Sequence, residues 1–270
     1  MEHTTESTAV EKIIREQFEF LSQSIKYASS IQKAIMPSQE KMGTLLPSHF
    51  LLFKPRDIVS GDFYWAAQKE NKTVVAVADC TGHGVPGALL TAIGICLLNQ
   101  IVLESEITTA SQILDQLQSK FHFTLSQKEE ECHLREGMDI ALCIIDFDKM
   151  ELQFAGACYP LFLVRHGVMT EYIGDKMMIN VQSPFEQQFT NQVVPLESGD
   201  TLYLFSDGFI DQFGGEKGEK KFGIKQFRTL LAEISANPLQ QQKEMLEEIF
   251  ELWRDEQYQI DDITILGIKI

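Results

Sequence analysis

The chain has 270 residues, of which 44% are hydrophobic and 23% charged, so it is long enough to bury one sizeable core and carry an appendage. Its formal net charge of −16 at pH 7 opposes association with nucleic acid and with anionic membrane surfaces. We therefore expect neither nucleic acid nor a membrane as a partner.

The five cysteines include no Cys-x-x-Cys pair and lie mostly among apolar residues. That pattern favours free thiols in a reducing compartment and disfavours a structural zinc site. The first residues are polar and lack the basic and apolar regions of a signal peptide. We predict a cytoplasmic location.

Residues 10–36 are predicted to form one helix, which Pro37 ends. Apolar residues recur in it at intervals of four and three: Ile14, Phe18, Leu21, Ile25 and Ala28. This spacing is typical of a coiled-coil seam and equally of an amphipathic helix that packs on its own domain. The pattern leaves both interpretations open.

After a polar linker at 37–48, short apolar runs rich in β-branched and aromatic residues predict strands. They lie at 50–53, 58–65, 72–78, 138–147, 151–155, 161–165, 192–196, 201–206 and 263–270. Helices are expected at 85–103, 109–127, 223–234 and 239–254. The absence of a regular β-α-β alternation predicts an α+β fold, with two antiparallel sheets packed as a sandwich and flanked by helices.

The segment 85–103 carries no charge and is long enough to span a bilayer. It contains Asn99 and Gln100, begins with Pro86 near its first turn, and follows an aspartate motif directly. These features favour a helix buried in a large core.

Four aspartates stand where apolar runs end or begin, each beside small or polar residues. They are Asp62 in Ser-Gly-Asp-Phe-Tyr, Asp79 in Asp-Cys-Thr-Gly-His-Gly-Val-Pro, Asp207 in Ser-Asp-Gly and Asp261 in Asp-Asp-Ile-Thr. Carboxylates are the ligands that Mg²⁺ and Mn²⁺ prefer. Such ions activate water against phosphate esters, so the sequence predicts a metal-dependent phosphohydrolase.

The motif that begins at Asp79 is the most specific of the four. A strand delivers the aspartate, a glycine-rich loop turns, and Pro86 opens a helix at a position where proline is favoured. Such a junction suits a metal and an anion. For His83 we leave open a general acid, a phosphate contact or a loop hydrogen bond.

Other charged residues near these motifs keep more than one interpretation. Adjacent residues on a strand face opposite ways, so we expect only one of Asp261 and Asp262 to point into the site. Asp139 enters an apolar run and is either hydrogen-bonded to backbone or a peripheral metal ligand. Lys54 and Arg56 are candidate phosphate-side cations, and a surface role is the alternative for Lys54.

Together, these motifs in this order resemble the PPM-type metal-dependent protein serine/threonine phosphatases, specifically the SpoIIE-like bacterial branch. The resemblance runs from about Phe50 to Ile270. It implies two Mn²⁺ or Mg²⁺ ions, with Asp79 bridging them and Cys80 offering its backbone carbonyl. Asp62, Asp207 and Asp261 would complete the ligand shells, and a metal-bound water would attack phosphorus.

The resemblance also implies a substrate, phosphoserine or phosphothreonine on a regulatory protein such as an anti-sigma-factor antagonist in a partner-switching pathway. It divides the chain into an N-terminal helix, 1–37, and a phosphatase domain, 48–270. The helix is then expected to be a regulatory or homodimer contact. Alternatives are a catalytically silent binding module and a small-molecule phosphomonoesterase.

The chain departs from the family pattern at several positions. The loop 155–160 reads Ala-Gly-Ala-Cys-Tyr-Pro where relatives often have histidine and proline after Ala-Gly, and Ser60 and Asn180 stand where glycine is common. Arg56 is displaced by one residue from the family's phosphate-binding arginine. His83 lies four residues after Asp79, whereas the family's catalytic histidine lies two after its bridging aspartate.

Overall fold

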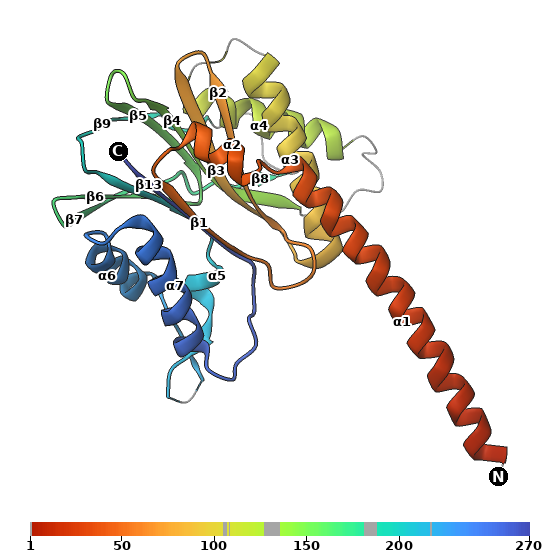
Figure 1. Ribbon diagram of the computed structural model, residues 1–270. Helices are drawn as coiled ribbons and strands as arrows, with labels where there is room; N and C mark the ends of the chain where they lie inside the picture. The colour runs from red at the N-terminus through yellow and green to blue at the C-terminus, as the bar shows by residue number, and fades with distance from the viewer. Residues whose placement is uncertain (1, 105–106, 108, 127–135, 181–187, 217) are drawn as a thin grey trace.

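The computed structural model describes residues 2–104, 107, 109–126, 136–180, 188–216 and 218–270, with side chains from residue 12 onward. Two antiparallel sheets face each other as a sandwich (Figure 1). The first has the order β1 (His49–Lys54), β13 (Ile263–Lys269), β10 (Thr201–Phe205), β6 (Leu161–Arg165) and β7 (Val168–Tyr172). The second has the order β2 (Asp62–Lys69), β3 (Lys72–Cys80), β4 (Gly137–Asp146), β5 (Glu151–Ala157) and β9 (Gln192–Pro195), and β8 (Ile179–Asn180) pairs with β4.

Helices cover both outer faces of this sandwich (Figure 1). Helices α3 (Gly84–Glu104) and α4 (Ala110–Leu125) cover one face, and α6 (Ile224–Ile234) and α7 (Leu239–Arg254) cover the other. The described chain also contains α1 (Glu2–Ile35), α2 (Gln39–Leu45) and α5 (Gly208–Asp211). A two-stranded ribbon of β11 (Phe213–Gly214) and β12 (Lys220–Lys221) follows α5. The predicted α+β sandwich flanked by helices is confirmed.

Alternation along the strands separates three apolar cores. Val75 and Val77 of β3 pack between the sheets with Leu204 of β10 and Leu266 of β13. The intervening residues, such as Ala76, face α3 and α4. A third core lies where α6 and α7 cover the outer face of the other sheet. The two-residue period of a strand thus builds a helix–sheet–sheet–helix stack.

Helix α3 is, within the described chain, the helix long and apolar enough to cross a membrane, with a mean hydropathy of 1.8. In the fold it packs on β2 and α4, and Ile95, Leu98 and Val102 are buried there. This placement agrees with the core helix expected from the sequence.

The structure differs from the sequence prediction at several segments, among them the linker and the start of β2. The expected polar linker 37–48 contains α2, which Ser38 caps: its Oγ accepts the backbone N–H of Lys41 at 3.2 Å. Met42 and Leu46 bury the apolar side of this short helix. Strand β2 begins at Asp62, so residues 58–61, which were predicted to start this strand, form a loop instead.

The long helix α1 leaves the body of the molecule and extends away from it (Figure 1). Ser29, Gln32 and Met36 near its C-terminal end are buried against the domain. Farther out, Phe18 is 69% exposed and Leu21 is 58% exposed. The same helix therefore packs on its own domain at one end and presents an apolar stripe at the other.

We expect Phe209→Ala to lower the free energy of unfolding by about 3–5 kcal/mol, because it empties a buried site in a packed aromatic cluster. Phe209 is fully buried, and its ring centroid lies 5.0 Å from that of Phe222 and 5.1 Å from that of Phe227. Urea denaturation measures the change. Phe123→Ala is the control, because Phe123 is 72% exposed, and a loss of equal size there would contradict the assignment.

Candidate functional site

Three aspartates form one row across neighbouring strands. Asp62 of β2 is the register partner of Asp79 of β3, which is in turn the register partner of Asp139 of β4. Directly opposed residues of antiparallel strands point to the same face, here the inner face of the sandwich. Three carboxylates therefore share one end of the space between the sheets.

The opposite sheet brings two further aspartates to this end. Asp207 follows β10, and Asp261 precedes β13. A cavity of about 250 Å³ opens here, and its lining includes Asp79, Asp139 and Asp261. The other lining residues come from the loop after β3 and from the approach to β8: Cys80, Thr81, Gly82, His83 and Met178. The structure thus gathers the aspartates that the sequence singled out.

Asp62 is the most deeply buried of the group, at 1% exposure. Its Oδ2 accepts hydrogen bonds from Ser206 Oγ at 2.5 Å and Thr264 Oγ1 at 2.8 Å. Its Oδ1 is buried and has no hydrogen-bond partner. The two hydroxyls come from the facing sheet and hold the carboxylate in one orientation, with one oxygen left over.

Burial and the proximity of other carboxylates raise the pKa values of these aspartates. Desolvation, and after it the charge of Asp207, raises the pKa of Asp79 to about 7. Desolvation and the charge of Asp261 raise the pKa of Asp207 to about 6. The pKa of Asp62 is also raised well above its usual value, first by burial and then by Asp79. A cluster of this kind is costly unless positive charge joins it.

The donor set fits a hard divalent cation. Asp62, Asp139 and Asp207 each have a buried Oδ1 without a hydrogen-bond partner, and a divalent cation is one partner that such oxygens accept. Within the described residues, no group of three His, Cys, Asp or Glu side chains already stands close enough together to hold an ion. Side-chain rearrangement would be needed to bring these oxygens to one centre.

The adjacent carboxylates Asp261 and Asp262 have separate surroundings. Asp262 is 2% exposed, and its two oxygens accept the backbone N–H groups of Arg56 and Gly61, each at 2.7 Å. Asp261 lines the cavity, and its Oδ1 accepts the backbone N–H of Asp262 at 2.9 Å. Asp262 therefore ties the loop before Asp62 to β13, while Asp261 faces the cavity.

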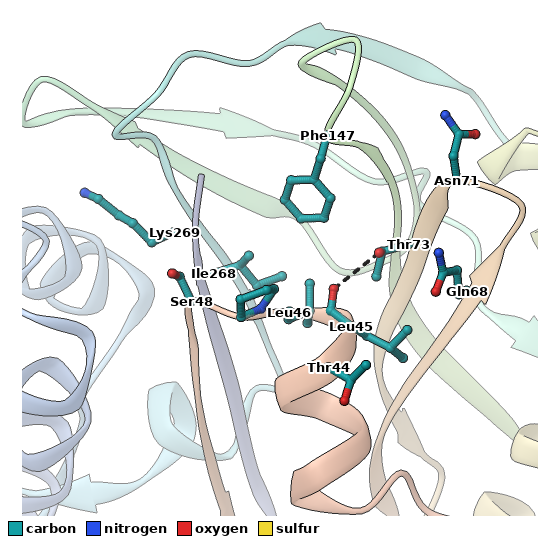
Figure 2. Close-up of a pocket in the computed structure, with 11 residues that line it drawn as sticks. Thr44, Leu45, Leu46, Ser48, Gln68, Asn71, Thr73, Phe147, Ile268 and Lys269 are labelled. Carbon is teal, nitrogen blue, oxygen red and sulfur yellow. Dashed lines mark hydrogen bonds between the residues drawn. The ribbon is translucent and has the colours of Figure 1, made fainter.

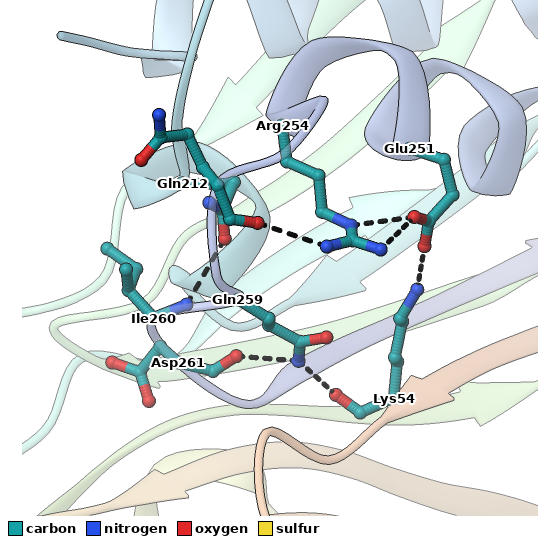
Figure 3. A network of polar contacts seen from close by, with 8 residues as sticks. Lys54, Gln212, Glu251, Arg254, Gln259, Ile260 and Asp261 are labelled. Atoms are coloured by element: carbon teal, nitrogen blue, oxygen red, sulfur yellow. Dashed lines mark hydrogen bonds and ion pairs between the residues drawn. The ribbon is translucent and has the colours of Figure 1, made fainter. Parts of the chain in front are cut away.

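Glutamine side chains support the segment before Asp261 (Figure 3). Gln259 Nε2 donates to the carbonyls of Lys54 and Asp261, both at 2.8 Å. Gln212, fully buried, accepts the backbone N–H of Ile260 at 3.2 Å. Sequence reasoning missed both residues, because a glutamine that bonds distant backbone leaves no local pattern.

At the mouth of the cavity, Arg56 and His83 contact each other. Arg56 Nη2 donates to His83 Nδ1 at 2.9 Å, and Asp57 Oδ2 lies 3.3 Å from the same guanidinium nitrogen. Asp57 Oδ2 also lies 3.3 Å from His83 Nδ1, so the three side chains form one cluster. Among the interpretations left open for His83, this contact matches a loop hydrogen bond. Lys54 pairs instead with Glu251 of α7, away from the cavity (Figure 3).

Tight backbone packing shapes the loop between β3 and α3. A Cβ placed on Gly61 would lie 2.6 Å from the carbonyl oxygen of Gly82, and one on Gly87 would lie 2.3 Å from it. The thiol of Cys80 is buried, 4.0 Å from Thr91 Oγ1 on the helix side of the sheet. The Cys80 side chain therefore lies on the helix side of the sheet, and its backbone is the part that lies beside the aspartates.

A larger cavity, about 350 Å³, lies at the opposite end of the sandwich (Figure 2). It is lined by the end of α2, the β2–β3 turn and the last residues of β13. Among the described residues no carboxylate lines it, and Lys269 is its charged side chain. It therefore lacks the carboxylate ligands that a divalent cation prefers.

The model of the family described as Stage II sporulation protein E (SpoIIE) matches residues 69–270, most of the chain. The chain belongs to this family. No match was found among curated proteins.

The solved SiaA-PP2C domain of Pseudomonas aeruginosa shares 34% sequence identity with this SpoIIE-family chain, and the two structures superpose with a TM-score of 0.85. The match covers 94% of this chain and 98% of that one. The PP2C phosphatase domain of SpoIIE from Bacillus subtilis, solved with a fragment of its regulatory domain, shares 21% identity with a TM-score of 0.66, covering 83% of this chain and 61% of that one. RsbX, solved in complex with magnesium, shares 14% identity with a TM-score of 0.55, covering 82% and 94%. The last two show the fold alone.

Ser60, two residues before Asp62, contacts the N-terminal helix. Gln32 of α1 is 6% exposed; its Nε2 donates to the Ser60 carbonyl at 2.6 Å and its Oε1 accepts the Ser60 N–H at 3.0 Å. Ser60 Oγ in turn accepts the N–H of Asp62 at 3.1 Å. Helix α1 is thus hydrogen-bonded to the residue two positions before Asp62, a link that spacing alone does not reveal.

We expect Asp207→Asn to stabilise the protein at pH 8 in the presence of a chelator. A carboxyl with a raised folded-state pKa stabilises the fold while protonated, below about pH 4, and this stabilisation is lost as the pH rises through about 6. The amide removes that cost, so we expect a gain of about 1–3 kcal/mol, or several degrees in Tm.

Thermal unfolding at pH 4 and pH 8 measures this effect. The gain should shrink at pH 4, where Asp207 is already protonated. Asp148→Asn, a change of the same chemistry in the exposed β4–β5 turn, should leave Tm unchanged at both values. Destabilisation by Asp207→Asn at pH 8 would show that Asp207 is not repelled by its neighbours.

Proposed function

We propose that the chain is a metal-dependent protein serine/threonine phosphatase of the SpoIIE-like branch. The observation that supports this most directly is the carboxylate row Asp62–Asp79–Asp139, with Asp207 and Asp261 facing it from the other sheet. The fold and the family support a protein phosphatase. The metal requirement and the substrate are parts of the proposal.

The proposed ligands are Asp62, Asp79, Asp207, Asp261 and the backbone carbonyl of Cys80, for two Mn²⁺ or Mg²⁺ ions. Asp79 is the proposed bridging group, because it stands in the middle of the row and feels the charges of Asp207 and Asp261. Bound divalent cations supply a water of lowered pKa and neutralise charge on a phosphate. The magnesium complex of RsbX is consistent with this choice.

The chain's own residues orient this chemistry. Ser206 and Thr264 hold Asp62 so that one oxygen remains for a cation. Asp262 and Gln259 set the position of Asp261. Asp139, whose pKa burial raises, is the proposed peripheral ligand.

For the mouth of the cavity we propose contacts to the phosphate. Arg56 already donates to the Ile260 carbonyl at 3.0 Å, which holds its guanidinium beside His83. His83, 55% exposed, offers a ring nitrogen to a phosphate that enters the cavity. We propose the phosphate contacts of Arg56 and His83 from the positions of these two side chains.

The proposed substrate is a phosphoserine or phosphothreonine on a regulatory protein, such as an anti-sigma-factor antagonist. We place the reaction in the cytoplasm, in keeping with the buried free thiols of Cys80 and Cys143. We assign residues 48–270 to the phosphatase domain and 1–37 to a regulatory helix.

The test is hydrolysis of a phosphoserine peptide with Mn²⁺, comparing the unmodified chain with Asp207→Asn. We expect activity that requires the metal and falls by at least about 100-fold in the variant, because one ligand oxygen pair is replaced by an amide. Asp148→Asn is the matched control and should retain full activity.

If the unmodified chain does not hydrolyse the peptide, the assay is repeated with a chain that lacks residues 1–36. Activity of the shortened chain would indicate that α1 holds the site inactive. Silence of both forms, with folding verified by circular dichroism, would overturn the proposal in favour of a binding module. Turnover of small phosphate esters but not of the peptide would favour a phosphomonoesterase.

For α1 we propose a homodimer contact through the stripe of Ile14, Phe18 and Leu21, which are 62%, 69% and 58% exposed. Replacing all three by glutamine should convert a dimer to a monomer, or change the activity, because the apolar seam is removed. Sedimentation velocity and the peptide assay measure the outcome. The control replaces Lys12, Glu16 and Glu19, which are exposed on the same helix. If the stripe variant changes neither the sedimentation nor the activity, the dimer assignment is wrong.

A further inference from the structure

The loop between β5 and β6 passes from one sheet to the other beside the aspartates. Its residues Cys158, Tyr159 and Pro160 lie in the segment where this chain departs from the SpoIIE-family pattern. Tyr159 is 7% exposed, although a connection between strands is normally at the surface. A buried tyrosine at this place requires a polar partner for its hydroxyl.

The backbone around Tyr159 is built to hold it in place. Cys158 adopts a left-handed conformation with φ of 62°, and its N–H donates to the Asp175 carbonyl at 2.8 Å. A Cβ on Gly156 would lie 2.2 Å from the Tyr159 carbonyl oxygen, and one on Gly174 would lie 2.5 Å from it. Two glycines therefore form a slot for this carbonyl, which leaves the Tyr159 backbone little freedom.

The hydroxyl of Tyr159 bridges two aspartates that belong to different sheets. It donates to Asp79 Oδ2 at 2.8 Å, and the backbone N–H of Asp207 approaches it at 3.4 Å. Because an amide N–H can only donate, the phenol hydrogen must point to Asp79.

We propose that Tyr159 is a positioning residue that holds the Asp79 carboxylate for divalent-cation binding through its hydroxyl. The proposal rests on the metal centre proposed above. A hydrogen bond to the outer lone pair of a ligating carboxylate fixes its orientation, and loss of such a bond weakens metal binding by about 10- to 100-fold. The same hydroxyl links the end of β3 to the start of α5, so it also spaces Asp79 from Asp207.

The decisive variant is Tyr159→Phe, which removes one oxygen and keeps the buried ring. Titration of Mn²⁺, followed by electron paramagnetic resonance of the free ion, should show at least about 10-fold weaker binding. The Mn²⁺ concentration for half-maximal peptide hydrolysis should rise by the same factor, while kcat at saturating Mn²⁺ changes far less.

The matched control is Tyr203→Phe. Tyr203 is also fully buried, and its hydroxyl donates to Gln242 Oε1 at 2.7 Å, away from the aspartates. This variant loses a comparable hydrogen bond, so it reports the effect of destabilisation alone. Its Mn²⁺ affinity should equal that of the unmodified chain, and Tm measured with chelator should show that both variants fold.

Equal Mn²⁺ affinity of Tyr159→Phe and the unmodified chain would overturn the role of Tyr159 and leave the metal centre standing. Tighter binding by the variant would overturn it as well, because the hydroxyl would then compete with the cation for Asp79. If both tyrosine variants bind Mn²⁺ equally weakly, the loss reflects general destabilisation, and the proposed role of Tyr159 is overturned. Absence of Mn²⁺ binding by the unmodified chain would overturn the metal centre and, with it, this proposal.

Discussion

Repulsion among carboxylates on neighbouring strands is the constraint to which the rest of this structure responds. Asp62, Asp79 and Asp139 occupy one row, so antiparallel pairing alone forces them onto the same face. Burial then raises the pKa of each of them. The apolar core between the sheets supplies the free energy that keeps this row together in the absence of a counter-charge.

Neutral donors surround the row and orient it without cancelling its charge. Ser206 and Thr264 bond Asp62, and Tyr159 bonds Asp79. Backbone N–H groups meet Asp262, and glutamine amides hold the segment before Asp261. Such contacts fix carboxylate orientation while the negative potential stays available to a cation, which is the arrangement expected of a preorganised ligand set.

The N-terminal helix joins this arrangement at one point. Gln32 hydrogen-bonds both backbone groups of Ser60, and Ser60 bonds the N–H of Asp62. Any displacement of α1 along its axis must break these buried bonds or move the loop before Asp62. The helix that carries the exposed stripe is therefore linked to the candidate site by a chain of hydrogen bonds through Gln32 and Ser60.

Much of the fold and of the site could be predicted from the sequence. The strands, the helix after Asp79 and the four aspartate motifs are encoded by local periodicity, turn residues and spacing, and the predicted sandwich is confirmed. Helix α2 was missed because its seven residues carry Met42 and Leu45 in a polar segment, too short for a periodic signal. Strand β7 was missed for a similar reason, since it has five residues and none of them is buried.

The amino-acid sequence by itself determined which residues carry acidic chemistry and which elements present them, because strand ends and glycine turns follow from neighbouring residues. Only the tertiary structure decided which carboxylates face one another and which contacts orient them. Tyr159 lies 80 positions from Asp79, and Gln32 lies 28 positions from Ser60. Contacts over such separations depend on how the two sheets and α1 pack, and no local pattern in the chain encodes that packing.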